Sequence, residues 1–186
     1  MRRRRFELQG VLLAALLPAC AALAGPAAAE ESYPFRASLF IGLGGAFDAE
    51  PSSDLDHSSF QLGFSWESDY DVLVGLRYGE IGWDGDAGLG ARVGPDLAYL
   101  TAAGEYLFHE GYYTSGVYLG LGWYQLDEDA AAEIPSDSAI GLVLGVTGDF
   151  RITDRFSILV ELSGHYTDLD DADLLAMGHA GIAYRF

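Results

Sequence analysis

The stretch Gly-Ile-Ala-Tyr-Arg-Phe, residues 181–186, ends the chain and is the best guide to its fold. Apolar residues alternate in it with small or polar ones, so Ile182, Tyr184 and Phe186 share one face of a predicted strand. In water such a strand would present an apolar face beside an open edge, which is an aggregation hazard. In a closed barrel the edge pairs with the first strand and the apolar face meets lipid. The segment therefore favours the last strand of a transmembrane β-barrel.

The same period-two alternation recurs eight times along the chain, and no window shows a sustained helical pattern. The predicted strands span about 36–46, 58–67, 71–81, 97–108, 113–125, 139–150, 155–166 and the terminal segment. One face of each strand is bulky and apolar, whereas the other is rich in glycine, serine and isolated charges. Bulky residues suit a lipid-facing surface, and small residues let a narrow lumen close. We therefore predict an all-β fold, an eight-stranded antiparallel transmembrane β-barrel.

The connections between these strands alternate in length. Three are short, one is of medium length, and the others are long; in chain order they are 47–57, 68–70, 82–96, 109–112, 126–138, 151–154 and 167–175. Long loops on one rim and tight turns on the other are typical of bacterial outer-membrane barrels, with the long loops extracellular. We expect an outer-membrane location with both termini in the periplasm. Aromatic residues cluster near both predicted rims, where amphipathic rings favour the membrane interface.

The N-terminus has the pattern of a secretory signal peptide. A basic run, Arg2 to Arg5, precedes an apolar stretch from Val11 to Leu23, and small residues end at Ala29. We expect a signal over 1–29 and the barrel domain over 30–186. The apolar stretch is too short to span a bilayer. Cys20 follows Leu-Pro-Ala in a loose lipobox, so lipidation at Cys20 is the alternative.

Composition excludes several functional classes. Cys20 is the only cysteine, so the chain after residue 29 has no disulfide framework, thiol nucleophile or cysteine metal site. Removing residues 1–29 removes four Arg and one Glu, which leaves 6 Arg (10 − 4) against 27 acidic residues (28 − 1), a formal charge of −21. Such a surface repels nucleic acid and attracts divalent cations or basic partners. Adaptation to high salt or to acidic surroundings is the simpler explanation for the overall charge.

The eight alternating strands, the loop asymmetry and the terminal Gly-Ile-Ala-Tyr-Arg-Phe resemble the small outer-membrane barrels of the OmpA/OmpX type. The resemblance covers nearly the whole chain after residue 29. It implies recognition by periplasmic chaperones and the barrel-assembly machinery through the last strand, with Ile182, Tyr184 and Phe186 as the assembly signal. We expect the chain to end with the barrel, without the appended peptidoglycan-binding domain that longer relatives carry.

Charged and imidazole side chains fall on the predicted inward faces. The candidate lumen network comprises Arg36, Glu67, Arg77, Glu105, Asp149, Arg155, Glu161, His165, His179 and Arg185. A buried charge must be paired or it destabilises the fold by several kcal/mol. We expect Arg–carboxylate pairs that fill the lumen, because an eight-stranded barrel is just wide enough for its side chains. A narrow ion-conducting pore is the alternative.

The segment His165-Tyr166-Thr167-Asp168 resembles the His-x-Ser region of the outer-membrane lipid A 3-O-deacylases. The resemblance implies His165 as the base and Thr167 at the position of the nucleophile, in an esterase. This sequence departs from that pattern, since Thr replaces Ser and His179 stands where the eighth strand would carry a Glu. A nucleophile needs both a base and an orienting group. A rim histidine that is hydrogen-bonded within the lumen is the alternative.

Acidic residues crowd the long loops, and the last loop carries Asp168, Asp170, Asp171 and Asp173. Converging carboxylates are suitable ligands for Ca²⁺ or Mg²⁺. No EF-hand pattern is present, so solvated acidic loops are the default, and cation bridging to anionic lipopolysaccharide is a second possibility.

The sequence therefore predicts a non-enzymatic outer-membrane barrel, without a cofactor, that serves envelope integrity or surface interaction. A lipid A-modifying esterase and a narrow pore remain as alternatives. Outer-membrane lipid and lipopolysaccharide are the expected surroundings.

Overall fold

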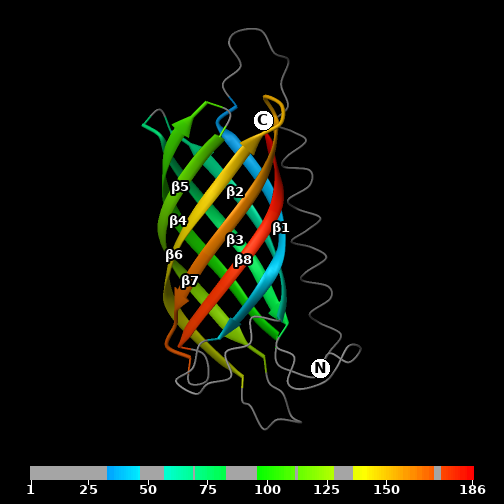
Figure 1. The fold of residues 1–186 in the computed structure, drawn as a ribbon. Helices are drawn as coiled ribbons and strands as arrows, with labels where there is room; N and C mark the ends of the chain where they lie inside the picture. Colours follow the sequence, from blue (N-terminus) through cyan, green and yellow to red (C-terminus); the bar gives the residue numbers. More distant parts are fainter. Residues whose placement is uncertain are drawn as a thin grey trace. The chain divides into compact units, whose positions relative to one another are not determined.

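The computed structural model describes residues 33–46, 57–68, 70–82, 96–111, 113–127, 136–169 and 173–186. The predicted signal, residues 1–29, lies outside them. Residues 34–185 form one compact unit, and its strands close into an antiparallel β-barrel (Figure 1). Among the residues that the structure describes, no helix has the length and apolar character needed to cross a membrane.

Eight strands follow one another in chain order around the barrel. They are β1 (Phe35–Ala46), β2 (His57–Glu67), β3 (Val72–Gly82), β4 (Asp96–Glu110), β5 (Tyr113–Leu126), β6 (Asp137–Arg151), β7 (Phe156–Tyr166) and β8 (Leu174–Arg185). These bounds agree with the alternation in the sequence to within a few residues. The predicted all-β class and the eight-stranded antiparallel barrel are confirmed.

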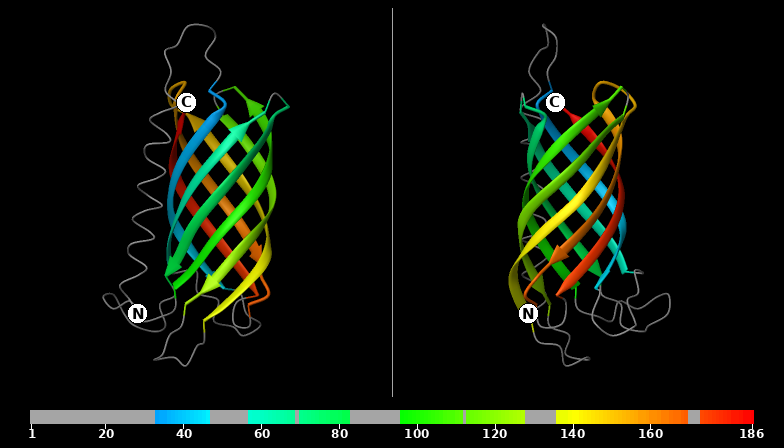
Figure 2. Two further views of the ribbon diagram at one scale, coloured as in Figure 1. Left: turned by 180° about the vertical axis from the view of Figure 1, so that it is seen from behind. Right: turned by 60° about the vertical axis from the view of Figure 1, so that its left-hand side comes forward.

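The last strand closes the barrel, as its sequence predicted. Leu39 of β1 is paired with Leu62 of β2 on one side and with Ile182 of β8 on the other. Every strand therefore has two hydrogen-bonded neighbours, and the sheet has no free edge. Figure 2 shows the strands continuing around the side that is hidden in Figure 1.

The two faces of the sheet differ sharply in what they expose. Large apolar side chains point outward from every strand, and those near the middle of the strands are well exposed, such as Leu119 at 62%, Leu144 at 58% and Leu162 at 64%. Inward-facing residues alternate with them and are mostly buried. An exposed apolar belt around a closed barrel is suited to contact with lipid, since a soluble β-domain would turn this face toward its core.

Short connections share one rim with the start of β1 and the end of β8, because each strand reverses the direction of the one before (Figure 1). The connection between β4 and β5 is only two residues long, and Gly111 adopts a φ of +65° in it. That left-handed conformation favours glycine because it has no Cβ to clash. The longer connections lie at the other ends of the strands. The two rims are called the short-turn rim and the long-loop rim below.

Buried side chains line the lumen, and their character changes from one rim to the other. An apolar cluster lies toward the long-loop rim and consists of Ile81, Leu97, Tyr99, Tyr124, Leu126, Leu169, Leu175 and Met177. Leu169 follows β7 and is fully buried in this cluster, where a backbone hydrogen bond from Thr167 to Asp173 closes the connection. The charged side chains lie nearer the short-turn rim.

Candidate functional site: the charged lumen

Three guanidinium groups and three carboxylates meet inside the barrel. The cluster consists of Arg36, Arg77, Arg185, Glu105, Asp149 and Glu161. All six come from the alternating positions that face the lumen, and five of them are at most 7% exposed. The formal charges balance, three positive against three negative. Balance is the condition under which buried ions are tolerated, because an unpaired buried charge is strongly destabilising.

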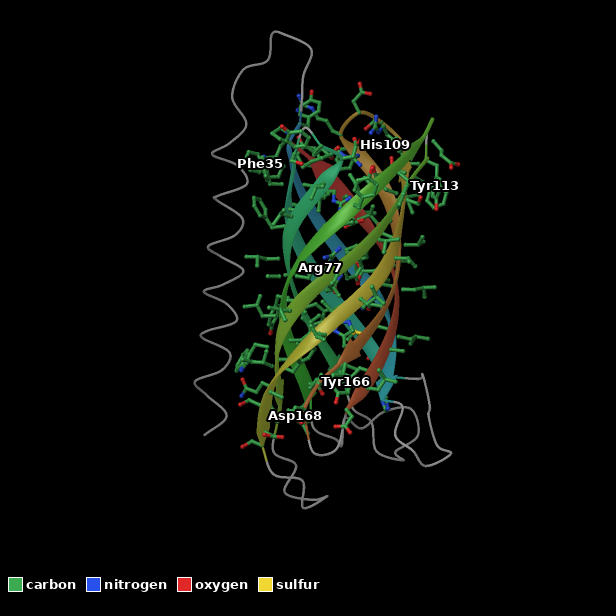
Figure 3. All side chains as sticks on the ribbon, turned by 90° about the vertical axis from the view of Figure 1, so that its left-hand side faces the viewer. Phe35, Arg77, His109, Tyr113, Tyr166 and Asp168 are labelled. Atoms are coloured by element: carbon green, nitrogen blue, oxygen red, sulfur yellow. The ribbon has the colours of Figure 1, made fainter. Side chains whose placement is uncertain are left out.

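Arg77 ties opposite walls of the barrel together. Its Nη2 lies 3.1 Å from Oε2 of Glu105 on the neighbouring strand β4. Its Nε lies 3.3 Å from Oε2 of Glu161 on β7, four strands away around the barrel. The guanidinium carbon also lies 4.1 Å above the centre of the Tyr118 ring, a cation–π contact. In Figure 3 Arg77 lies between the rim marked by His109 and the rim marked by Asp168.

Two further arginines complete the cluster toward the short-turn rim. Arg36 places Nη1 3.3 Å from Oδ2 of Asp149 and Nη2 3.7 Å from Oε2 of Glu105. Arg185 donates to the same Asp149 oxygen, and its Nη1 donates to Oγ of Ser157 at 2.6 Å. Each carboxylate in the cluster therefore contacts at least one guanidinium.

Neutral polar groups donate to the second oxygen of Glu105 and to one oxygen of Glu161. Thr147 donates its hydroxyl to Oε1 of Glu105. Gln61 donates Nε2 to Oε1 of Glu161 at 3.1 Å, and the Tyr99 hydroxyl donates to Oε1 of Gln61 at 3.0 Å. Charge-assisted hydrogen bonds of this kind are stronger than neutral ones. The network thus links the ion cluster to the aromatic layer near the long-loop rim.

The packing of these side chains leaves a small space among them. A cavity of about 10 Å³ is lined by Arg36, Arg77, Thr147 and Glu161, among others. That is about the space one water molecule needs.

Most residues of the predicted lumen network lie where the alternation placed them. Six form the ion cluster, and His165 and His179 are buried farther along the lumen. Glu67 is half-buried at the end of β2, near the short-turn rim. The prediction that Arg155 faces the lumen was wrong. Arg155 is exposed, and its Nη1 donates to the Tyr184 hydroxyl at 3.4 Å. The physical reason is that Arg155 belongs to the turn before β7, where strand alternation has not yet begun.

The His165 region does not have the arrangement of a nucleophile with a free base. The His165 ring is 2% exposed and faces the lumen. Its Nδ1 lies 2.7 Å from the Tyr124 hydroxyl, and its Nε2 lies 3.0 Å from Oγ of Ser163. Thr167 is buried as well, and its Oγ1 accepts from the backbone N–H of Leu169 at 3.4 Å. Both ring nitrogens are thus engaged by residues other than Thr167, and neither group faces the lipid side.

The candidate cation ligands lie at the long-loop rim. Asp168 and Asp173 are exposed, whereas Asp170 and Asp171 lie outside the described residues. Within the described ranges, no three His, Cys, Asp or Glu side chains come close enough to hold a metal ion.

In the predicted assembly segment, Ile182 and Tyr184 lie on the outward face of β8, and Ile182 is 58% exposed. Phe186 follows the end of the strand.

Several lumen residues escaped the sequence-based prediction of the network. They are neutral and include Gln61, Tyr99, Tyr118, Tyr124, Thr147 and Ser157. Their signal was present in the strand phase, since each falls on the inward alternation. Glycines make room for the large ones: a Cβ on Gly79 would lie 2.3 Å from the Tyr99 ring, and one on Gly145 would lie 2.4 Å from the Tyr118 ring.

Comparison with known proteins agrees with this architecture. No family model matches the chain, and no curated protein matches its sequence. Among solved structures, Neisserial surface protein A (NspA) aligns with a TM-score of 0.63 and 15% identity over 84% of this chain and 100% of that one. Ail, the attachment invasion locus protein of Yersinia pestis, aligns with a TM-score of 0.56 and 20% identity over 81% of this chain and 98% of that one.

The N-terminal β-barrel domain of Pseudomonas aeruginosa OprF is also similar, with a TM-score of 0.53 and 18% identity over 80% of this chain and 97% of that one. At these identities the similarity establishes the fold alone. This chain has the fold of the small eight-stranded outer-membrane β-barrels, as the resemblance in the sequence implied.

Proposed function

We propose that this chain is a non-enzymatic integral outer-membrane β-barrel protein with a closed lumen, and that its long, acidic connections act as an interaction surface. The observation that carries the proposal is the balanced ion cluster that bridges opposite walls of a barrel whose outer face is apolar. A barrel tied together internally is a rigid support for loops on one rim. Binding residues commonly lie on loops positioned by a rigid scaffold.

The geometry favours a lumen closed by side chains over an open, ion-conducting pore. Three guanidiniums and three carboxylates contact one another across the lumen, and the apolar cluster fills it toward the long-loop rim. An ion would have to displace both groups of side chains in order to pass.

An esterase is less well supported, because His165 is engaged by Tyr124 and Ser163 inside the barrel. The test is the mass spectrum of lipid A from a Gram-negative host that expresses the chain, compared with the same host carrying an empty vector. We expect identical spectra. Loss of one acyl chain in the expressing strain would overturn the non-enzymatic proposal.

The proposed orientation places the long-loop rim outside the cell and both termini in the periplasm. Single cysteines report it cleanly, because the chain has no cysteine besides Cys20. Asp129→Cys lies in the connection between β5 and β6, and Asp154→Cys lies in the turn between β6 and β7. A membrane-impermeant maleimide applied to intact cells should label the first variant and spare the second. The reverse pattern would refute the orientation.

Divalent cations and lipopolysaccharide are proposed as partners of the long-loop rim, on the strength of its acidic residues. The measurement is the thermal unfolding midpoint in millimolar Ca²⁺ and in chelator, with and without lipopolysaccharide. A rise with Ca²⁺ that requires lipopolysaccharide indicates bridging, and a rise without it indicates a site formed by the loops alone. An unchanged midpoint in both conditions refutes both forms of the proposal.

A further inference from the structure

A small cavity lies within the ion cluster, and side chains from several strands line it. Its volume is about 10 Å³, and its polar lining includes Arg36 of β1, Arg77 of β3, Thr147 of β6 and Glu161 of β7. A water molecule needs about this much space. The cavity therefore matches a ligand of the size of one water molecule.

Two buried polar atoms of the lining residues are left without a hydrogen bond. Among the residues that the structure describes, four buried side-chain nitrogen or oxygen atoms have no such partner, and two of them are Nε of Arg36 and Oε2 of Glu161. Glu161 is 2% exposed, and the Arg36 side chain is 11% exposed. A buried donor or acceptor without a partner destabilises the fold. Both atoms therefore require a ligand that hydrogen-bonds with them.

The ion pairs of the cluster do not supply these two hydrogen bonds. Oε2 of Glu161 lies 3.3 Å from Nε of Arg77, but this contact lacks the geometry of a hydrogen bond. Arg36 reaches Asp149 and Glu105 through its Nη atoms, at 3.3 and 3.7 Å, so its Nε takes no part. Each residue therefore has one polar atom that its charged partners leave unsatisfied.

The two unsatisfied atoms select a ligand that both accepts and donates. The Nε–H group of Arg36 needs an acceptor, whereas the ionised carboxylate of Glu161 needs a donor. A metal cation cannot accept from Nε–H, and a halide cannot donate to Oε2, so either ion would leave one atom unsatisfied. Water can accept and donate at once, and it has the size that the cavity allows.

Thr147 offers a third contact to such a ligand. Its hydroxyl hydrogen is donated to Oε1 of Glu105, so the lone pairs of its oxygen remain as acceptors. A water that accepts from Arg36 and donates to Glu161 and Thr147 would make about three hydrogen bonds, which is usual for a buried water.

We propose that this cavity binds one ordered water molecule, which joins Arg36 of β1 to Glu161 of β7. These two strands are not paired with each other, because β8 lies between them. The water is thus a bridge inside the barrel between strands that share no backbone hydrogen bonds. The proposal rests on the closed lumen of the proposed function, in which this water is a fixed member of the ion cluster.

A crystal structure of the wild-type protein, at a resolution that shows ordered water, tests the site. We expect one density peak at about 2.7–3.2 Å from both Arg36 Nε and Glu161 Oε2. Crystals grown with rubidium bromide distinguish water from an ion, because rubidium and bromide both scatter anomalously. An anomalous peak in the cavity, or a direct hydrogen bond between Arg36 and Glu161 without a peak, would overturn the proposal.

Arg36→Lys tests the role of Nε in holding the water. Lysine keeps the positive charge and places a methylene where Nε stands, so the peak should be lost. Arg185→Lys is the matched control: it makes the same change in the same cluster, at a residue that does not line the cavity, and should keep the peak. An unchanged peak in Arg36→Lys, or loss of the peak in both variants, would contradict the assignment. The wild-type map decides the proposal if either variant fails to fold.

The wild-type map also separates the water site from the closed lumen. A continuous row of water peaks from one rim to the other would contradict both the closed lumen and the single bridging water. A lumen closed by side chains, with no peak in the cavity, would contradict the water site alone.

Discussion

Replacing Glu105 with Gln tests the ion cluster at its most buried carboxylate. Glu105 is 1% exposed, and its Oε2 lies 3.1 Å from Arg77 Nη2 and 3.7 Å from Arg36 Nη2. Thr147 donates to its other oxygen. The substitution preserves the size of the side chain and removes one negative charge. The cluster then holds three guanidiniums against two carboxylates.

The expected loss follows from this imbalance. Removing one partner of a buried ion pair typically costs about 3–5 kcal/mol, because the remaining charge is uncompensated. A native protein is stable by only about 5–15 kcal/mol, so about a fifth or more of the free energy of unfolding is at stake. Adding Arg77→Gln restores the charge balance, with two guanidiniums against two carboxylates. The free energy of unfolding should therefore fall by less in the double variant than the sum of the decreases in the two single variants.

Denaturant unfolding of the barrel in lipid vesicles measures these differences, with tryptophan fluorescence as the signal. Trp66 and Trp123 are about half exposed on the outward face, so their emission reports the loss of lipid contact. Glu110→Gln is the control: it makes the same change at an exposed position at the end of the same strand and should alter stability by less than about 0.5 kcal/mol. If Glu105→Gln unfolds like Glu110→Gln, or if the losses at Glu105 and Arg77 add, the cluster does not stabilise the barrel as described.

Three further predictions concern the packing of the barrel and its outer face, and all use the same unfolding assay. Gly79→Ala should lower the free energy of unfolding by about 1–3 kcal/mol, because the new Cβ would lie 2.3 Å from the Tyr99 ring. Gly104→Ala should be near neutral, because its new Cβ would have no atom within 4 Å. Equal effects of the two substitutions would contradict the close packing of tyrosine on glycine. Leu119→Arg, on the outward belt, should lower the free energy of unfolding by about 2–4 kcal/mol in vesicles, and a neutral result would contradict lipid contact at that depth. Leu169→Ala should lower the free energy of unfolding by about 2–5 kcal/mol, because loss of a fully buried side chain leaves a cavity in the apolar cluster. An unaltered midpoint would contradict the packing of Leu169 in that cluster.

The strands were predictable because alternation is a local property with a strong physical cause. A strand that separates lipid from a lumen must alternate along its whole length, as Val117, Leu119 and Leu121 do against Gly116, Tyr118 and Gly120. The phase of each strand then fixes which charges face inward. Arg77, Glu105 and Glu161 could therefore be assigned to one lumen from sequence alone.

Two features could not be predicted in this way. Arg155 precedes β7 by one residue, and the alternation does not show where a turn ends and a strand begins. The outward position of Arg155 is therefore known only from the structure. The partners within the lumen depend on the stagger between strands, which alternation does not encode. Nothing in the sequence shows that Gln61 of β2 bridges Tyr99 of β4 and Glu161 of β7.

Conductance across a planar lipid bilayer tests the central claim, a membrane-spanning barrel with a closed lumen, most directly. Folded wild-type protein should insert without producing steady single-channel conductance steps. Glu105→Gln should destabilise the barrel and should also produce no such steps. Insertion is verified independently by recovery of the protein with the lipid. Regular, reproducible conductance steps from the wild-type chain would show that ions pass the Arg77 contacts, and would contradict the account.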